Sequence, residues 1–150
     1  RDVLNRAEQA VGLRARDDIE QIHAGASPIL LGPTNRSELI RLLIEACPSA
    51  GWIGFCGVSD IGWEWAGQQG MDLDRVLVLN AHKDHQVGDL CALLVDACDV
   101  VCLDVPELSG AQQRTLAARA RSMGRTIVTL CPWPGLSRVA AAHRRMRVVV

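Results

Sequence analysis

Short runs of apolar residues alternate along the chain with segments whose apolar residues recur every three or four positions. Continuous apolar runs are typical of buried strands, and helical spacing is typical of amphipathic helices. The runs predict strands at residues 29–31, 51–57, 75–80, 100–103, 126–130 and 146–150. The helical spacing predicts helices at residues 36–47, 60–70, 87–98, 109–123 and 138–143.

Strands that alternate with helices through short connections favour a mainly parallel sheet covered by helices on both faces. We therefore predict one α/β domain over residues 29–150. Residues 1–28 are polar, with a few apolar positions at helical spacing. They predict an N-terminal helical arm, which either packs beside the domain or contacts another chain.

Capping residues support two of the helix boundaries. Asn35 with Glu38, and Ser109 with Gln112, have the spacing of a capping box, in which each side chain bonds the backbone of the other residue. Gly124 follows the second of these helices, where a glycine commonly ends a helix in the left-handed conformation.

The composition is that of an ordinary globular domain. The 150 residues are 49% hydrophobic and 22% charged, and no apolar stretch approaches the roughly 20 residues of a membrane span. Six cysteines occur without a Cys-x-x-Cys pair, which favours reduced thiols in the core. Because reduced cysteines are typical of the cytoplasm, we expect a cytoplasmic protein.

Charge is divided unevenly along the chain. Residues 1–107 hold eight Lys and Arg against 17 Asp and Glu, whereas residues 108–150 hold eight Arg and no acid. This asymmetry indicates either a polyanionic or acidic partner, or pairing between the two parts within the fold. DNA would be contacted weakly and through charge alone, because no aromatic residues interleave with the arginines. The candidate contact residues are Arg114, Arg119, Arg121, Arg125, Arg144, Arg145 and Arg147.

The segment from Ile29 to Leu39 has the outline of an ATP-binding phosphate loop, because an apolar run meets Gly32 and a helical pattern follows. The phosphate-loop pattern requires Gly, four residues, and then Gly-Lys followed by Ser or Thr. Counting from Gly32, Ser37 falls on the second glycine, Glu38 on the lysine and Leu39 on the hydroxyl residue. Deleting two residues would place Arg36 and Ser37 on the Lys-Ser pair, in a loop too short to surround a phosphate. We expect no tight nucleotide site, no cofactor and no enzymatic activity.

Asp104 closes the apolar run at residues 100–103. A carboxylate at the tip of a strand holds magnesium in phosphate-loop proteins, but an Asp also favours a turn before Val-Pro. Without the lysine we favour the turn. Residues 82–85, His-Lys-Asp-His, lack the further ligands that a metal site needs, so we predict no metal site.

Trp63 and Trp65 flank Glu64 near the start of a predicted helix. Side chains two positions apart on a helix point about 200° away from each other. We therefore expect that both cannot enter one core. An exposed tryptophan would be a candidate anchor for a protein interface, and the alternative is that it covers the rim of the sheet.

Together these segments resemble the RecA superfamily. GPTNRSEL at residues 32–39 stands where RecA-like proteins keep the phosphate loop, and ACDVVCLD at residues 97–104 is similar to their Walker B strand, with Asp104 on the acidic position. Gly-x-Asp-Leu-x-Arg at residues 70–75 is similar to their approach to the next strand. The catalytic base of active members would fall near Ser59 or Asp60.

Within the superfamily the chain is most similar to the shortened, catalytically degraded members, which are ImuA-type mutagenesis proteins and SulA-type division inhibitors. Residues 116–135, LAARARSMGRTIVTLCPWPG, resemble the ImuA form. The resemblance implies a non-catalytic accessory protein of SOS mutagenesis and translesion synthesis, acting as an adaptor for an ImuB-like polymerase relative, with self-association as a further expectation. One alternative is a SulA-like inhibitor that binds FtsZ. Another is a residual nucleotide-binding ATPase that uses Arg36 and Asp104.

Overall fold

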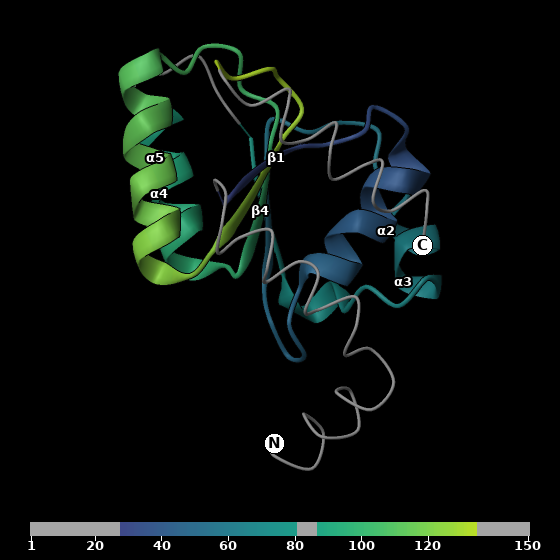
Figure 1. The fold of residues 1–150 in the computed structure, drawn as a ribbon. Coiled ribbons are helices and arrows are strands. Elements are labelled where there is room, and N and C mark those ends of the chain that lie inside the picture. The colour runs from purple at the N-terminus through teal and green to yellow at the C-terminus, as the bar shows by residue number, and fades with distance from the viewer. Residues whose placement is uncertain (1–27, 81–86, 135–150) are drawn as a thin grey trace, which may run out of the picture.

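The computed structural model describes residues 28–80 and 87–134, which form a five-stranded sheet (Figure 1). All four strand pairings are parallel, and the strand order is β1-β5-β4-β2-β3. The strands are β1 (Ile29–Leu31), β2 (Ile53–Cys56), β3 (Val76–Leu79), β4 (Val100–Leu103) and β5 (Thr126–Thr129). The predicted N-terminal arm, residues 82–85 and the predicted elements at 138–143 and 146–150 lie outside the described residues.

Helices cover both faces of the sheet, which confirms the predicted α/β architecture. Figure 1 shows α4 and α5 on one face and α2 and α3 on the other. The helices are α2 (Arg36–Ala46), α3 (Trp63–Gln68), α4 (Val87–Ala97) and α5 (Gly110–Met123), with a 3-10 turn at Leu73–Arg75. Within the described residues, no helix is both long and apolar enough to span a bilayer.

The two faces hold separate apolar cores, and β4 contributes to both. Val100 and Cys102 face the core under α2 and α3, whereas Val101 and Leu103 face the core under α4 and α5. All four side chains are fully buried. This alternation follows from the two-residue period of a strand. Because neither face of β4 meets water, the strand carries no polar residue.

The predicted helix boundaries are largely confirmed. The Asn35 side chain accepts a hydrogen bond from the Glu38 amide at 3.0 Å, which is one half of the predicted capping box. Both halves form between Ser109 and Gln112, and Gly124 ends α5 with a φ of 66°. The predicted helix at residues 60–70 is shorter, because Asp60 has a φ of 62° that a right-handed helix does not allow.

The expectation that Trp63 and Trp65 cannot share one core is wrong. Both side chains are partly buried against the cluster under α2 and α3. The Trp63 ring meets Phe55 edge-on, with the ring centres 5.1 Å apart, and the Arg41 guanidinium lies 5.8 Å from the centre of the Trp65 ring. The two side chains flank the buried Ala66 on opposite sides of α3, so both can lie against the cluster although they point apart. Trp65 is therefore covered by α2 rather than projecting freely.

The six cysteines are all free thiols, as predicted. Four of them, Cys56, Cys91, Cys98 and Cys102, are fully buried and serve as small core residues. Burial raises the pKa of Cys102 to about 12, so this thiol stays protonated at neutral pH.

Candidate functional site

The carboxyl edge of the sheet carries the residues that the sequence assigns to a degenerate phosphate loop. Gly32 follows β1 and Asp104 follows β4, and β5 lies between these two strands. Gly32 donates its amide to the Thr129 carbonyl at 2.8 Å, and Leu130 donates its amide to the Leu103 carbonyl at 2.8 Å. Because neighbouring strands lie about 4.8 Å apart, Gly32 and Asp104 are separated by roughly 10 Å.

Gly32 is required by packing. A Cβ at this position would lie 2.7 Å from a methyl group of Val128 and 3.0 Å from a methyl group of Leu130, and both distances are too short for carbon atoms. The glycine therefore lets β1 and its following turn approach β5. It is explained without a phosphate ligand.

Arg36 begins α2, and its guanidinium bonds the chain itself. Its Nε donates to the carbonyl oxygen of Ser59 at 2.9 Å, and its Nη1 donates to that of Thr34 at 3.2 Å. These bonds join the start of α2 to the loop that follows β2. The neighbouring Ser37 side chain is exposed. With Asn35 capping the first turn, this helix end already has acceptors from the protein.

Asp104 is joined to both of its neighbours at the carboxyl edge. Its amide donates to the Cys56 carbonyl at 2.9 Å, and its Oδ1 accepts a hydrogen bond from the Cys131 thiol at 3.0 Å. Burial and this hydrogen bond raise the pKa of the Cys131 thiol to about 11, so the thiol remains a donor at neutral pH. One carboxylate oxygen is thus engaged by the fold.

Gly57 allows the close approach between β2 and β4 at this edge. Its φ is 75°, and a Cβ there would lie 2.4 Å from the Asp104 carbonyl oxygen. Only glycine fits, because both the conformation and the space exclude a side chain. Neither Gly57 nor Cys131 was predicted to act at this edge. The Cys-Pro-Trp-Pro segment at residues 131–134 was the available sequence signal for a rigid turn here, and its Trp133 is buried in the core under α4 and α5.

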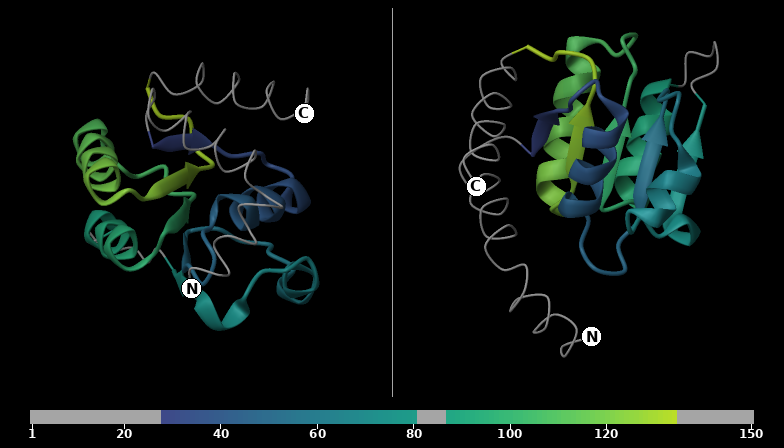
Figure 2. Two further views of the ribbon diagram at one scale, coloured as in Figure 1. Left: turned by 60° about the horizontal axis from the view of Figure 1, so that its bottom comes forward. Right: turned by 90° about the vertical axis from the view of Figure 1, so that its right-hand side faces the viewer.

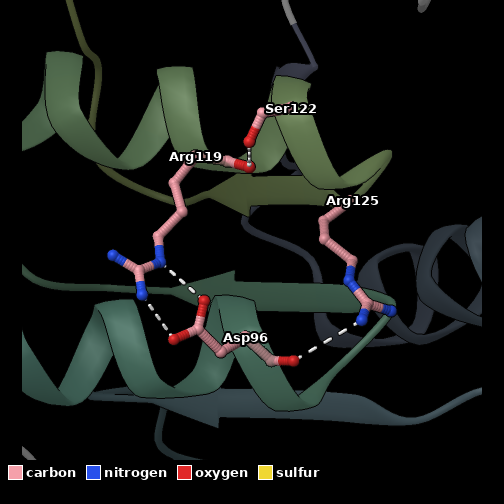
Figure 3. A network of polar contacts seen from close by, with 4 residues as sticks. All are labelled: Asp96, Arg119, Ser122 and Arg125. Atoms are coloured by element: carbon pink, nitrogen blue, oxygen red, sulfur yellow. Dashed lines mark hydrogen bonds and ion pairs between the residues drawn. The ribbon is translucent and has the colours of Figure 1, made fainter.

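Two of the candidate contact arginines are paired with acids of the same chain, and Figure 3 shows the first pair, Arg119 with Asp96. Arg119 binds Asp96 through two hydrogen bonds of 2.6 Å, which lower the pKa of Asp96 and raise that of Arg119. Arg125 pairs with Asp99 at 2.7 Å, and the second oxygen of Asp99 accepts the Trp52 amide at 2.8 Å. For these two arginines, pairing with acids of the first 107 residues accounts for the positive charge without an external partner.

The structure describes two of the other candidate arginines. Arg114 and Arg121 are exposed on α5. Arg144, Arg145 and Arg147 lie outside the described residues. Within residues 28–80 and 87–134, no group of three or more His, Cys, Asp or Glu side chains is arranged to hold a metal ion.

Comparisons with known proteins agree with this fold. The structure is similar to the crystal structure of SulA from Pseudomonas aeruginosa, with a TM-score of 0.51 and 18% sequence identity. The similarity covers 67% of this chain and 92% of SulA. At this level of identity it shows a shared fold alone.

Sequence comparison gives a closer relationship. The chain is 30% identical over 160 residues to the uncharacterized protein Rv3395c of Mycobacterium tuberculosis (strain ATCC 25618 / H37Rv). The match covers 93% of this chain and 78% of that protein. The family model described as the MT3502 N-terminal domain matches residues 23–135, which include every strand of the sheet. The chain therefore belongs to the MT3502 N-terminal domain family.

Proposed function

We propose that this chain is a non-catalytic adaptor of SOS-induced mutagenesis in the cytoplasm, which binds an ImuB-like polymerase relative. One observation carries the proposal: the side chains at the nucleotide-binding positions are engaged by the fold itself. Arg36 bonds two carbonyl groups, and Asp104 accepts the thiol of Cys131. Glu38 occupies the position of the phosphate-loop lysine, where its carboxylate would repel a triphosphate.

Titration calorimetry with ATP and magnesium tests the non-catalytic half of the proposal. We expect no binding tighter than a dissociation constant of about 1 mM, because the first turn of α2 is capped and offers no lysine. The control is Glu38→Lys, which supplies a cation at that position and would reveal whether charge alone limits binding. Binding by the wild-type chain in the micromolar range would support the residual ATPase and contradict the adaptor.

A pull-down tests the adaptor half. The full chain, used as bait in lysate from DNA-damaged cells, is expected to recover an ImuB-like polymerase relative, identified by mass spectrometry. Recovery should persist without added nucleotide, because the proposed contact needs none. Deletion of the gene should lower the mutation frequency of DNA-damaged cells without changing that of undamaged cells.

The fold similarity to SulA favours a second candidate, a division inhibitor that binds FtsZ. Overproduction distinguishes the two functions. Filamentous cells together with recovery of FtsZ would support inhibition. Normal cell length together with altered damage mutagenesis would support the adaptor.

A further inference from the structure

Exposed apolar side chains gather at the β3 edge of the sheet. Figure 2 shows β3 in teal at the margin opposite β1 in dark blue, and β3 pairs only with β2 among the described strands. Of the five large apolar side chains that are well exposed in the described residues, three lie in β3 or in the 3-10 turn before it, and a fourth lies on α4, the helix that follows β3 in the chain. The four are Leu73 (43% exposed), Leu77 (37%), Val78 (48%) and Leu93 (58%). We call these four residues the β3-edge patch.

The main chain of β3 also has free positions at this margin. The Leu79 carbonyl accepts a hydrogen bond from the amide of Gly57, the residue after β2, at 3.4 Å. The main-chain polar groups of Leu79 therefore face β2. In a parallel ladder, residues two apart face the same neighbour. The N–H and C=O groups of Leu77 therefore face β2 as well, and those of Val76 and Val78 point outward. No described strand pairs with them, so an extended segment has hydrogen-bonding groups to join.

Helix α4 borders one face of this edge with apolar residues. Its contacts with α5 involve Gly88, which lies beside Gln112, and Asp96, which binds Arg119. Helical geometry places Leu90 and Ala97 on the flank away from α5, and Leu93 between that flank and the outer surface of the helix. Leu79 of β3 packs in the same core cluster as the buried face of α4, so this flank and Leu77 lie on one side of the sheet.

The other face of the edge carries Val78 and Leu73. Val76, two residues before Val78, packs against the cluster under α2 and α3, which assigns Val78 to that side. Leu73 lies beside Gly67 of α3, because a Cβ on Gly67 would meet it at 3.2 Å. A strand added to β3 would thus meet apolar side chains on both of its faces.

Acidic residues outnumber basic ones in the described segments that carry this patch. The described residues from 57 to 97 contain one base, Arg75, which bonds the Ala50 carbonyl at 2.6 Å and pairs with Asp72. The acids in the same range are Asp60, Glu64, Asp72, Asp74, Asp89 and Asp96. Asp74 precedes β3, Asp89 lies in the first turn of α4, and neither forms an ion pair with a described residue. The charges of these described residues therefore favour a positively charged ligand.

We propose that the β3 edge binds an extended segment of another protein, which adds to the sheet as a strand beside β3. The segment would carry apolar residues in its middle and Lys or Arg at its ends. Main-chain hydrogen bonds would give affinity, and the apolar and basic side chains would give specificity. This inference rests on the proposed adaptor function and supplies its docking surface.

A synthetic peptide tests the inference without the physiological partner. The probe is fluorescein-labelled Lys-Lys-Val-Thr-Val-Thr-Val-Thr-Lys-Lys, and its matched control has Glu in place of Lys. We expect the full chain to raise the anisotropy of the basic peptide and to bind the acidic one at least about tenfold more weakly, because Asp74 and Asp89 repel it. Equal binding of the two peptides would overturn the assignment of a basic ligand.

Variants locate the site. Val78→Pro removes an outward N–H while leaving the groups that face β2, and proline is tolerated at such edge positions. It should weaken binding of the basic peptide about tenfold, whereas Val78→Thr, which keeps the N–H and the branched shape, should not. Leu93→Ser changes an exposed position on α4 and should weaken binding about threefold without altering the circular dichroism spectrum. Unchanged affinity in both Val78→Pro and Leu93→Ser would overturn the inference.

Two other occupants of the edge would contradict the proposal. If sedimentation shows a dimer that Val78→Pro dissociates, a second copy fills the edge. Peptide binding that requires removal of residues 144–150 would show instead that the chain's own basic end fills it. If pull-down of the polymerase relative is unaffected by Val78→Pro, the edge inference fails while the adaptor function stands. If no polymerase relative is recovered but the peptide binds as expected, the inference about the β3 edge holds and the adaptor function is contradicted.

Discussion

The carboxyl edge and the β3 edge of the same sheet differ in how the chain uses its interaction groups. At the carboxyl edge, the guanidinium of Arg36 and the carboxylate of Asp104 already have partners inside the protein. At the β3 edge, the outward N–H groups and the apolar side chains of Leu77 and Val78 have none among the described strands. The difference separates groups that maintain the fold from groups available to a ligand.

The sequence resemblance and the structure favour different edges of the sheet as the binding site. A RecA-like pattern directs attention to the carboxyl edge, where ligands of open α/β sheets usually bind. In this chain, the short connection after Gly32 and the capping by Asn35 leave that edge occupied by its own loops. Substitutions at the carboxyl edge should therefore change stability, and substitutions at the β3 edge should change binding.

The largest expected effect is that of Gly57→Ala. Its φ of 75° and the Asp104 carbonyl oxygen 2.4 Å from the added Cβ should together cost about 3 kcal/mol in the free energy of unfolding. Urea denaturation followed by circular dichroism measures the loss. The matched control at the β3 edge is Val78→Thr, which should change the same free energy by less than about 0.5 kcal/mol. A larger loss for Val78→Thr than for Gly57→Ala would invalidate the comparison.

An intermediate effect is expected at the edge of the sheet opposite the carboxyl edge, where Asp99 precedes β4 and Arg125 precedes β5. Arg125→Met leaves the partly buried carboxylate of Asp99 with only the Trp52 amide as partner, which should cost about 1–2 kcal/mol. Asp99→Asn combined with Arg125→Met should recover part of that loss, because the uncompensated charge is then removed. Arg121→Met, an exposed arginine on the preceding helix, is the control and should leave Tm unchanged. Equal Tm values for the two single variants would contradict the role of the Arg125–Asp99 pair.

Much of the fold could be predicted because its signals are local. The β4 run shows its burial on both faces through its lack of polar residues, and the Ser109 and Gln112 box with Gly124 marks both ends of α5. The helix at residues 60–70 was predicted too long because apolar and polar spacing carries no information about the positive φ of Asp60. Trp63 and Trp65 were misjudged because side chains about 200° apart can still flank the one face that a helix buries, here at Ala66.

The site was harder to predict because its contacts join distant parts of the chain. Asp104 and Cys131 are 27 residues apart, and Arg125 and Asp99 are 26 apart, so no spacing motif links them. Both β3 and β4 consist wholly of apolar residues, yet β3 lies at the margin and β4 lies inside the sheet. Composition alone does not give strand order, so it could not show that Leu77 and Val78 would be exposed.

The smallest expected effect concerns the thiol of Cys131. Its pKa is raised from 9.0 to about 11 by burial first and by the hydrogen bond to Asp104 second, so the folded thiol ionises later than the unfolded one. The stability that Cys131 contributes is therefore complete below pH 9 and is lost as the pH rises through about 11. Asp104→Asn removes the negative charge and should lower this pKa in part, since burial remains.

Site-specific alkylation by iodoacetamide at pH 9, read by mass spectrometry, measures this change at Cys131. The rate should increase about threefold in Asp104→Asn because a larger fraction of the thiol is ionised. Cys47, the other half-buried cysteine, serves as the internal control and should react at an unchanged rate. Pull-down of a partner should also be unaffected by Asp104→Asn, because the carboxylate acts within the fold. A lost partner together with an unchanged alkylation rate would move the binding surface from the β3 edge to the carboxyl edge.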